Sequence, residues 1–76
     1  MQTMKGVIEL RSGSQIDCDA WKIRFQDRHA VLIPISDGDD LAPIPLKELK
    51  SVWGLDVSQE VTQKGIYGLL FKRFGM

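Results

Sequence analysis

A six-residue apolar run at 30–35 is followed by a polar cluster at 36–40 and then by a second apolar-rich stretch at 41–46. Asp-Gly stands inside the polar cluster, and this dipeptide between two β-type runs is a strong local signal for a tight turn. The pattern therefore predicts a β-hairpin with strands at 30–35 and 41–46. The acidic residues of the cluster keep its tip in water.

The N-terminal region alternates with a period of two. Within residues 4–11, Ile8 and Leu10 fall on one face of an extended chain, and the charged residues beside them fall on the other. The Ser-Gly-Ser segment at 12–14 has the composition of a turn. We expect a first strand that ends at this turn.

Residues 15–26 also alternate, but the phase changes in the middle. Apolar side chains occupy even positions up to Ala20 and odd positions from Trp21 to Phe25. Because one extra residue restores the facing of an alternating strand, we expect a β-bulge or sharp bend near 19–21 that keeps the apolar set on the core side. The residues that then point outward are Lys22, Arg24 and Gln26. A short polar turn at 26–29 follows.

Two prolines interrupt the stretch 41–46. Pro43 and Pro45 alternate with apolar residues, and proline cannot donate a hydrogen bond to a neighbouring strand. We therefore expect one edge of this strand to be unpaired. Protection against edge-to-edge aggregation is the interpretation that we favour, and an edge on which a partner docks is the alternative.

The C-terminal third changes its apolar period. From Leu46 the spacing is three, which predicts a short 3₁₀ or helical turn at 46–51 before the chain becomes extended again at 52–53. A looser spacing of four predicts a C-terminal helix from about Ser58. Two glycines inside it weaken the helix, since each costs about 1 kcal/mol relative to alanine.

Short, strongly bent strands without a long helix between them predict a mainly β fold, in the form of a small SH3-like or Sm-like barrel of about five strands. We expect one domain, 1–76, with the barrel at about 4–55 and an apolar and basic segment at 56–76. A domain of this size buries only about 60% of its unfolded surface. Such domains often gain stability by association.

Charge and cysteine content narrow the function. Ten basic and ten acidic residues cancel, whereas nucleic-acid-binding proteins usually carry a basic excess. A single cysteine forms no internal disulfide and fits a reducing compartment. The chain starts without the apolar stretch of a secretory signal, and no run reaches membrane-spanning length. We expect a cytoplasmic protein with no membrane partner.

The residues do not form a recognisable catalytic pattern. Cys18 and His29 are unique in the chain and could act as nucleophile and base. However, Cys18 has the inward phase of a buried, inert thiol, and His29 falls in a polar turn. One cysteine and one histidine do not make a zinc site, and no glycine-rich phosphate loop is present. We predict no enzyme, no cofactor, no metal and no small-molecule substrate.

Two segments resemble Sm-like proteins. Residues 7–13 are similar to the first strand and polar-glycine turn of that family. Residues 25–33 are similar to the Phe-Asp turn and apolar third strand found there, including in the bacterial Sm-like RNA chaperone, and 46–52 could stand where the last connection leads into a fifth strand. The resemblance covers roughly 5–53 and implies the barrel fold and a tendency to form rings. RNA binding does not follow from it, because the family contacts RNA through an asparagine and this chain has none.

The segment 66–74 holds six large apolar residues in nine positions. It could cap the mouth of the barrel, or it could bind a partner or another subunit, because aromatic residues concentrate binding energy. A membrane-surface helix is a weaker option, since few basic residues accompany it. The residues that we predict for a partner or oligomer contact are Tyr67, Leu70, Phe71, Phe74 and Trp53.

A second candidate site is basic. Its members are Lys22, Arg24, Arg28 and His29. Exposed together, they would follow a phosphate backbone while Tyr67 or Trp53 stacks on bases. The alternative is an ordinary charged sheet exterior, neutralised by nearby aspartates.

The absence of catalytic patterns and the surplus of apolar residues at the C-terminus predict a non-enzymatic protein-association module. It would act as a homo-oligomer, as an adaptor or inhibitor of a larger protein, or as both. The alternative function is an Sm-like ring that binds RNA through the basic residues.

Overall fold

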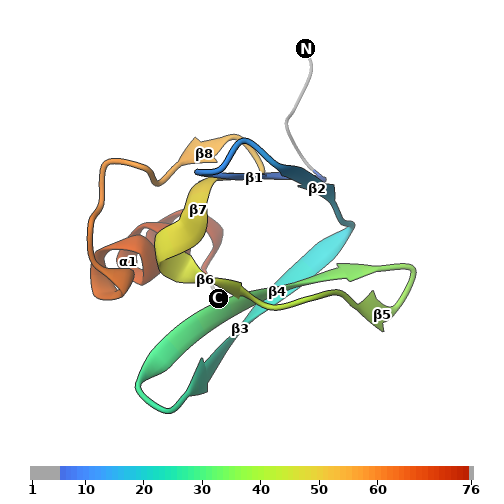
Figure 1. Ribbon diagram of the computed structural model, residues 1–76, viewed down its shortest axis with the longest axis horizontal. Helices are drawn as coiled ribbons and strands as arrows, with labels where there is room; N and C mark the ends of the chain where they lie inside the picture. The colour runs from blue at the N-terminus through green and yellow to red at the C-terminus, as the bar shows by residue number, and fades with distance from the viewer. Residues whose placement is uncertain (1–5, 76) are drawn as a thin grey trace.

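The computed structural model describes residues 6–75. In this part of the chain 46% of the residues are in strands and 21% are helical, which confirms the predicted mainly β fold. Two antiparallel sheets face each other and one C-terminal helix packs beside them (Figure 1). The first residues of the predicted N-terminal strand, 4–5, lie outside the described part.

The first sheet joins segments from the two ends of the β region. Its strands are β1 (Val7–Leu10), β2 (Gln15–Asp17), β7 (Leu49–Val52) and β8 (Leu55–Asp56). Their order is β2-β1-β7-β8, all antiparallel. The sheet therefore brings the chain after residue 48 back beside its start.

The second sheet has β4 at its centre. Its strands are β3 (Ala20–Gln26), β4 (His29–Ser36), β5 (Asp39–Asp40) and β6 (Ile44–Pro45). β3 pairs with one edge of β4, and β5 and β6 pair with successive parts of the other edge. Within the described chain no strand pairs with the far edge of β3.

Three two-residue turns close the hairpins. Each has a positive φ at both central residues, as type I′ turns require. The three turns are Asp27-Arg28, Asp37-Gly38 and Trp53-Gly54. The predicted Asp-Gly hairpin is confirmed. The prediction that Trp53 is extended is wrong: its φ is 50°, because it occupies a left-handed turn position.

The predicted strand 15–26 is divided between the two sheets. Cys18 donates its backbone N–H to the Gly6 carbonyl at 2.7 Å, and Asp19 donates its own to the Ile35 carbonyl at 3.0 Å. Because these two consecutive amides bond to partners in different parts of the fold, the chain bends between β2 and β3. The break lies at 18–19, at the edge of the predicted position. Lys22, Arg24 and Gln26 are all exposed, as predicted.

The predicted strand 41–46 is shorter than expected. Only β6 lies within it, because Pro43 has no N–H to offer the sheet. β6 pairs with β4 alone, which confirms the predicted sheet edge.

The 3₁₀ turn and the C-terminal helix are both present. The turn η1 spans Leu46–Glu48 and leads directly into β7. The helix α1 spans Gln63–Phe74 and starts later than the predicted Ser58. Its start is set by Thr62, whose side chain accepts a hydrogen bond from the Gly65 N–H at 3.0 Å.

Both sheets and α1 contribute to one buried core. Its members include Ile8, Leu32, Ile44, Leu46, Leu49, Val52, Val57, Ile66 and Leu70. Cys18 is 5% exposed, so the predicted burial of its thiol is confirmed. Phe25 is 66% exposed, and the prediction that it faces the core is wrong. This end of β3 extends past the buried cluster.

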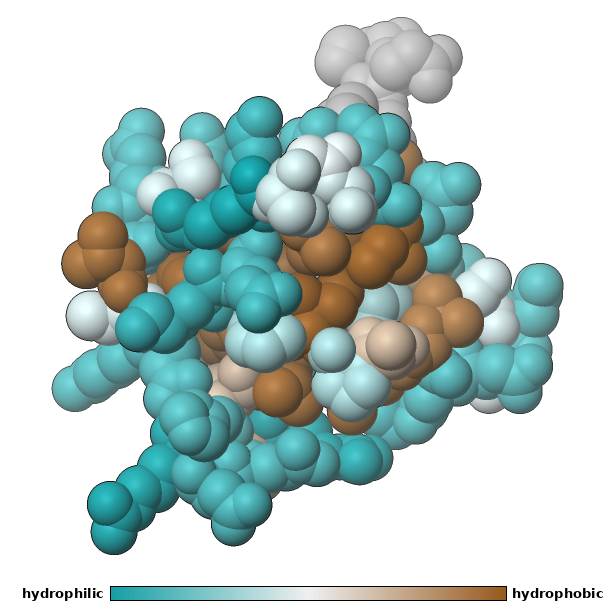
Figure 2. Space-filling view, in the orientation of Figure 1, coloured by the Kyte–Doolittle hydropathy of each residue, from teal (hydrophilic) through white to brown (hydrophobic). Residues whose placement is uncertain are grey.

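The two sheets do not close into a continuous barrel, since no strand ladder joins them in the described residues. Hydrophobic residues are visible in the middle of the face shown in Figure 2, within a surround of hydrophilic residues. The predicted barrel thus remains a prediction, and what the structure shows is an open pair of sheets beside a helix.

Candidate binding groove

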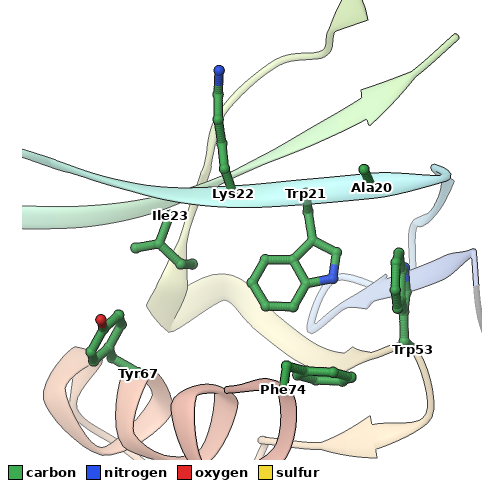
Figure 3. Close-up of a pocket in the computed structure, with 7 residues that line it drawn as sticks. All are labelled: Ala20, Trp21, Lys22, Ile23, Trp53, Tyr67 and Phe74. Atoms are coloured by element: carbon green, nitrogen blue, oxygen red, sulfur yellow. The ribbon is translucent and has the colours of Figure 1, made fainter. Parts of the chain in front are cut away.

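An aromatic-lined groove lies between β3 and α1 and has a volume of about 570 Å³. This is within the range of cavities that hold ligands. Trp21 and Ile23 project from β3 toward α1, and Tyr67 and Phe74 project back from the helix (Figure 3). Its lining residues are Ala20, Trp21, Lys22, Ile23, Trp53, Tyr67 and Phe74.

The groove follows the unpaired edge of β3. Four consecutive residues of this strand, 20–23, line it, although side chains of a strand alternate between its two faces. Figure 3 shows this alternation, with Lys22 on the side opposite to Trp21. The groove therefore lies on the Trp21 face of β3 and reaches the main chain of this strand. β4 covers one edge of β3, and no strand of the described residues covers the other.

Backbone groups of β3 point into this edge. In an antiparallel pair, residues alternate between those that exchange two hydrogen bonds with the partner strand and those whose N–H and C=O point away. Trp21 lies opposite Pro34, which has no N–H, and the Pro34 carbonyl instead accepts from the Leu41 N–H at 2.7 Å. Trp21 therefore belongs to the outward-pointing set. By the period of two, Ile23 and Phe25 belong to it as well.

Three rings form the floor at one end of the groove. The ring centres of Trp21 and Trp53 are 6.1 Å apart, those of Trp21 and Phe74 5.4 Å, and those of Trp53 and Phe74 6.1 Å. The interplanar angles of 82–87° are edge-to-face contacts, which are favourable between aromatic rings. The three rings thus form one compact aromatic cluster.

Trp53 reaches this cluster from a strained backbone position. A bulky residue with positive φ costs about 1–3 kcal/mol, and Trp53 has such a φ in the turn between β7 and β8. Packing against Trp21 and Phe74 offsets this cost. Strain of this kind concentrates at functional sites, which supports the groove as the site.

The other end of the groove is more exposed. Phe25 and Tyr67 pack with ring centres 5.4 Å apart, and Tyr67 stacks on Phe71 at 6.3 Å. Phe71 is 52% exposed. A second hollow of about 310 Å³ continues beside Phe25 and Tyr67 toward Gln63 and Lys64. The apolar surface therefore extends along the length of β3.

The side chain of Gln63 anchors the start of α1. Its Oε1 accepts from the Ala30 N–H at 2.9 Å, and its Nε2 donates to the Arg28 carbonyl at 2.7 Å. The first residue of α1 is thereby joined to the β3–β4 hairpin.

The two elements that border the groove carry basic residues and no acidic ones. β3 carries two basic residues and α1 carries three, while all ten acidic residues of the chain lie in other segments. These basic residues are Lys22, Arg24, Lys64, Lys72 and Arg73. Lys22 pairs with Asp40 at 3.1 Å. The other four form no ion pair with the described residues.

Four of the five residues predicted for a partner contact lie at the groove or next to it. Trp53, Tyr67 and Phe74 line it, and Phe71 stacks on Tyr67 outside it. Leu70 is fully buried. It faces the core side of α1 and does not reach the groove.

The predicted basic residues are only partly brought together. Lys22 and Arg24 project from the same face of β3, the one opposite to the aromatic floor. Arg28 lies in the hairpin turn and His29 at the start of β4, both exposed. Cys18 and His29 lie near opposite ends of β3, so they do not form a dyad.

Trp21 and Ile23 were expected in the core and instead form half-buried walls of the groove. The hydrophobic pattern assigns them correctly to the inner face of β3. It does not show that the edge of this strand stays open. The prolines mark the opposite edge of the sheet.

The perturbed carboxylates belong to the first sheet. Hydrogen bonds from Ser51 Oγ at 2.9 Å and from Gln15 Nε2 at 3.0 Å lower the pKa of Glu9. Hydrogen bonds from the side chain and backbone of Ser58 lower the pKa of Asp56.

In residues 6–75, no cluster of three metal-ligating side chains is present. None of the helices described there is long and apolar enough to cross a membrane.

Comparison with models of protein families, with curated proteins and with solved structures finds no match.

Proposed function

We propose that this protein is a non-enzymatic protein-association module that binds through the groove between β3 and α1. The observation that carries the proposal is an aromatic, half-buried surface along an unpaired sheet edge. Aromatic residues dominate the energy of protein interfaces. These rings pack against the buried core on one side and stay only partly buried, so part of their surface is available for binding.

The partner is another protein or a second copy of the chain, and the module then acts as an adaptor or inhibitor, or as a homo-oligomer. We propose further that the open pair of sheets is a split form of the small SH3-like or Sm-like barrel. A reducing, cytoplasmic location fits the single buried thiol of Cys18.

Changing the exposed rings of α1 tests the proposal. We expect Phe71→Ser together with Phe74→Ser to change the assembly state or to abolish the binding of peptides, because both rings leave the apolar surface. Light scattering at two protein concentrations reports assembly, and selection from a random peptide library on the wild type reports binding. Phe71→Ser alone repeats the test at a residue that is already 52% exposed.

The matched control is Val61→Ser. Val61 is 76% exposed on the loop before α1 and lies outside the groove. A folded Phe71 and Phe74 double variant that assembles and binds like the wild type would contradict the proposal. So would a wild-type protein that is monomeric and enriches no peptide.

The second candidate function is RNA binding. The basic residues of β3 and α1 favour it, because these five cations could follow a phosphate backbone. It requires an affinity for single-stranded RNA that falls steeply with salt. A flat salt response, or no binding at low salt, argues against it.

A further inference from the structure

We propose that the groove takes an extended, acidic segment of a partner protein, which adds as a strand to the free edge of β3. This inference rests on the proposed association function and specifies the chemistry of the partner. Strand addition uses main-chain hydrogen bonds for affinity and side-chain pockets for specificity.

The main-chain part of the site is the outward-pointing set of β3. The amides of Trp21, Ile23 and Phe25 face the free edge, whereas those of the residues between them face β4. Three residues at a period of two span about 13 Å at about 3.3 Å per residue. A partner strand of about five residues matches this length.

The two faces of β3 define the side chains of the partner. Side chains of an added strand that lie on the Trp21 face meet the apolar surface of Ile23 and Tyr67. Those on the opposite face lie beside Lys22 and Arg24, where an opposite charge gives a favourable cross-strand pair. The site therefore selects apolar residues at alternate positions and acidic residues between them.

Charge also disfavours a second β3 as the added strand. Two copies of β3 would bring Lys22 and Arg24 beside the same residues of the other copy, and like charges across strands are destabilising. Asp40 compensates Lys22, but Arg24 forms no ion pair with the described residues, and β3 itself contains no acidic residue. The partner is therefore an acidic strand from a different sequence.

The outward main-chain groups of β3 favour a peptide over single-stranded nucleic acid. Their N–H and C=O groups can form the ladder of an added strand. A nucleic acid has no peptide backbone with which to form that ladder.

The test uses two libraries of displayed octapeptides. In one, Asp or Glu alternates with randomised apolar residues, and in the other Lys or Arg does. We expect the wild type to enrich the acidic library only. The double variant Lys22→Glu and Arg24→Glu should invert this preference, which a purely structural role of these exposed residues would not do.

A pair of substitutions at Phe25 isolates the main-chain contribution. Phe25→Ala and Phe25→Pro both remove the exposed ring, but only proline removes the outward N–H, and it leaves the bonds to β4 intact. We expect Phe25→Pro to bind a selected acidic peptide about tenfold more weakly than Phe25→Ala does, since one lost hydrogen bond is worth about that factor. Fluorescence anisotropy gives both affinities.

Amide hydrogen exchange provides the decisive readout. The amides of Trp21, Ile23 and Phe25 should exchange fast in the free protein and become protected when the selected peptide binds. If a peptide binds but these amides still exchange fast, the proposed association function is retained and strand addition is overturned.

Three other outcomes overturn the inference. They are equal enrichment of both libraries, binding of oligouridylate but of no peptide, and self-association that Phe25→Pro abolishes in the absence of peptide. Failure of every peptide and of self-association would overturn the proposed function as well.

Discussion

Gln63 joins the start of α1 to the β3–β4 hairpin through two hydrogen bonds, at 2.9 Å from the Ala30 N–H and 2.7 Å to the Arg28 carbonyl. Ala30 is only 3% exposed, so water does not easily replace the lost acceptor. We therefore expect Gln63→Ala to lower the free energy of unfolding by about 1–3 kcal/mol, the cost of an unpaired buried polar group. Urea unfolding measures this change.

The matched control is Gln59→Ala, at an exposed glutamine on the loop that leads to α1. It should leave the free energy of unfolding within about 0.5 kcal/mol of the wild type, as surface substitutions usually do. If the two variants are equally stable, Gln63 does not join α1 to the β3–β4 hairpin in solution.

Single residues also show where sequence reasoning fails. Trp53 was expected in an extended chain, yet it closes a hairpin with Gly54 at a positive φ, which a tryptophan rarely takes. Contacts with Trp21 and Phe74, which come from distant segments, help to stabilise that conformation. A local pattern contains no signal for such contacts.

At the scale of elements, α1 has a sequence poorly suited to a helix. Gly68 lies in its middle, exposed, and an added Cβ would meet no atom within 4 Å. We expect Gly68→Ala to raise the free energy of unfolding by about 1 kcal/mol, because alanine restricts the unfolded chain and favours the helix. Thermal or urea unfolding measures the gain.

Gly65→Ala is the contrasting variant. A Cβ at this position would collide with the carboxylate of Glu60 and crowd Thr62, which caps the helix. Gly65→Ala should therefore raise the free energy of unfolding by less than Gly68→Ala does, or should lower it. Equal gains at both positions would show that the start of α1 is looser than described.

The elements were predictable wherever one local signal decided them. Asp37-Gly38 fixed a hairpin, and the two prolines marked a sheet edge. The start of α1 was placed too early, because Val57 belongs to the buried core and lies on a loop, not on the first turn of the helix. The burial of Val57 comes from tertiary packing, but its spacing of four resembles that of a helix. This resemblance accounts for the error.

At the scale of the molecule, Glu9 connects three strands of the first sheet. It accepts hydrogen bonds from Ser51 of β7 and Gln15 of β2, and these lower its pKa below the ordinary 4.5. A carboxylate with a lowered folded pKa adds stability above its unfolded value, and this stability is lost as the pH falls through the folded value. The protein should therefore lose stability on acidification below about pH 4.5.

Ser51→Ala removes the largest cause of this shift. We expect its stability to depend less on pH in that window than that of the wild type, while Ser12→Ala, in an exposed turn, should behave like the wild type. Thermal midpoints between pH 7 and pH 3 measure the difference. If the thermal midpoints of both variants fall equally steeply with pH, Glu9 is excluded as a source of the acid sensitivity.

The groove itself could not be predicted at this scale. The residues 66–74 were recognised as a surplus of apolar side chains, and the rings of Tyr67, Phe71 and Phe74 do remain partly exposed. Its other wall, Trp21 and Ile23, looks like any inward face of a strand. Which edge of a sheet stays open depends on the order of strands, and hydrophobic alternation does not encode that order.

A neutral protein can still be an electric dipole. α1, with three basic residues and no acidic one, lies at one end of the long axis, and the β4–β5 turn, with Asp37, Asp39 and Asp40, lies at the other (Figure 1). The field of an approaching acidic surface therefore rotates the molecule before contact, so that the helix end leads. Such orientation speeds encounter more than it slows dissociation, and it fades as salt shortens the reach of the field to about 8 Å at physiological ionic strength. Of two proteins with equal affinity for an acidic partner, a protein oriented in this way would associate with it faster.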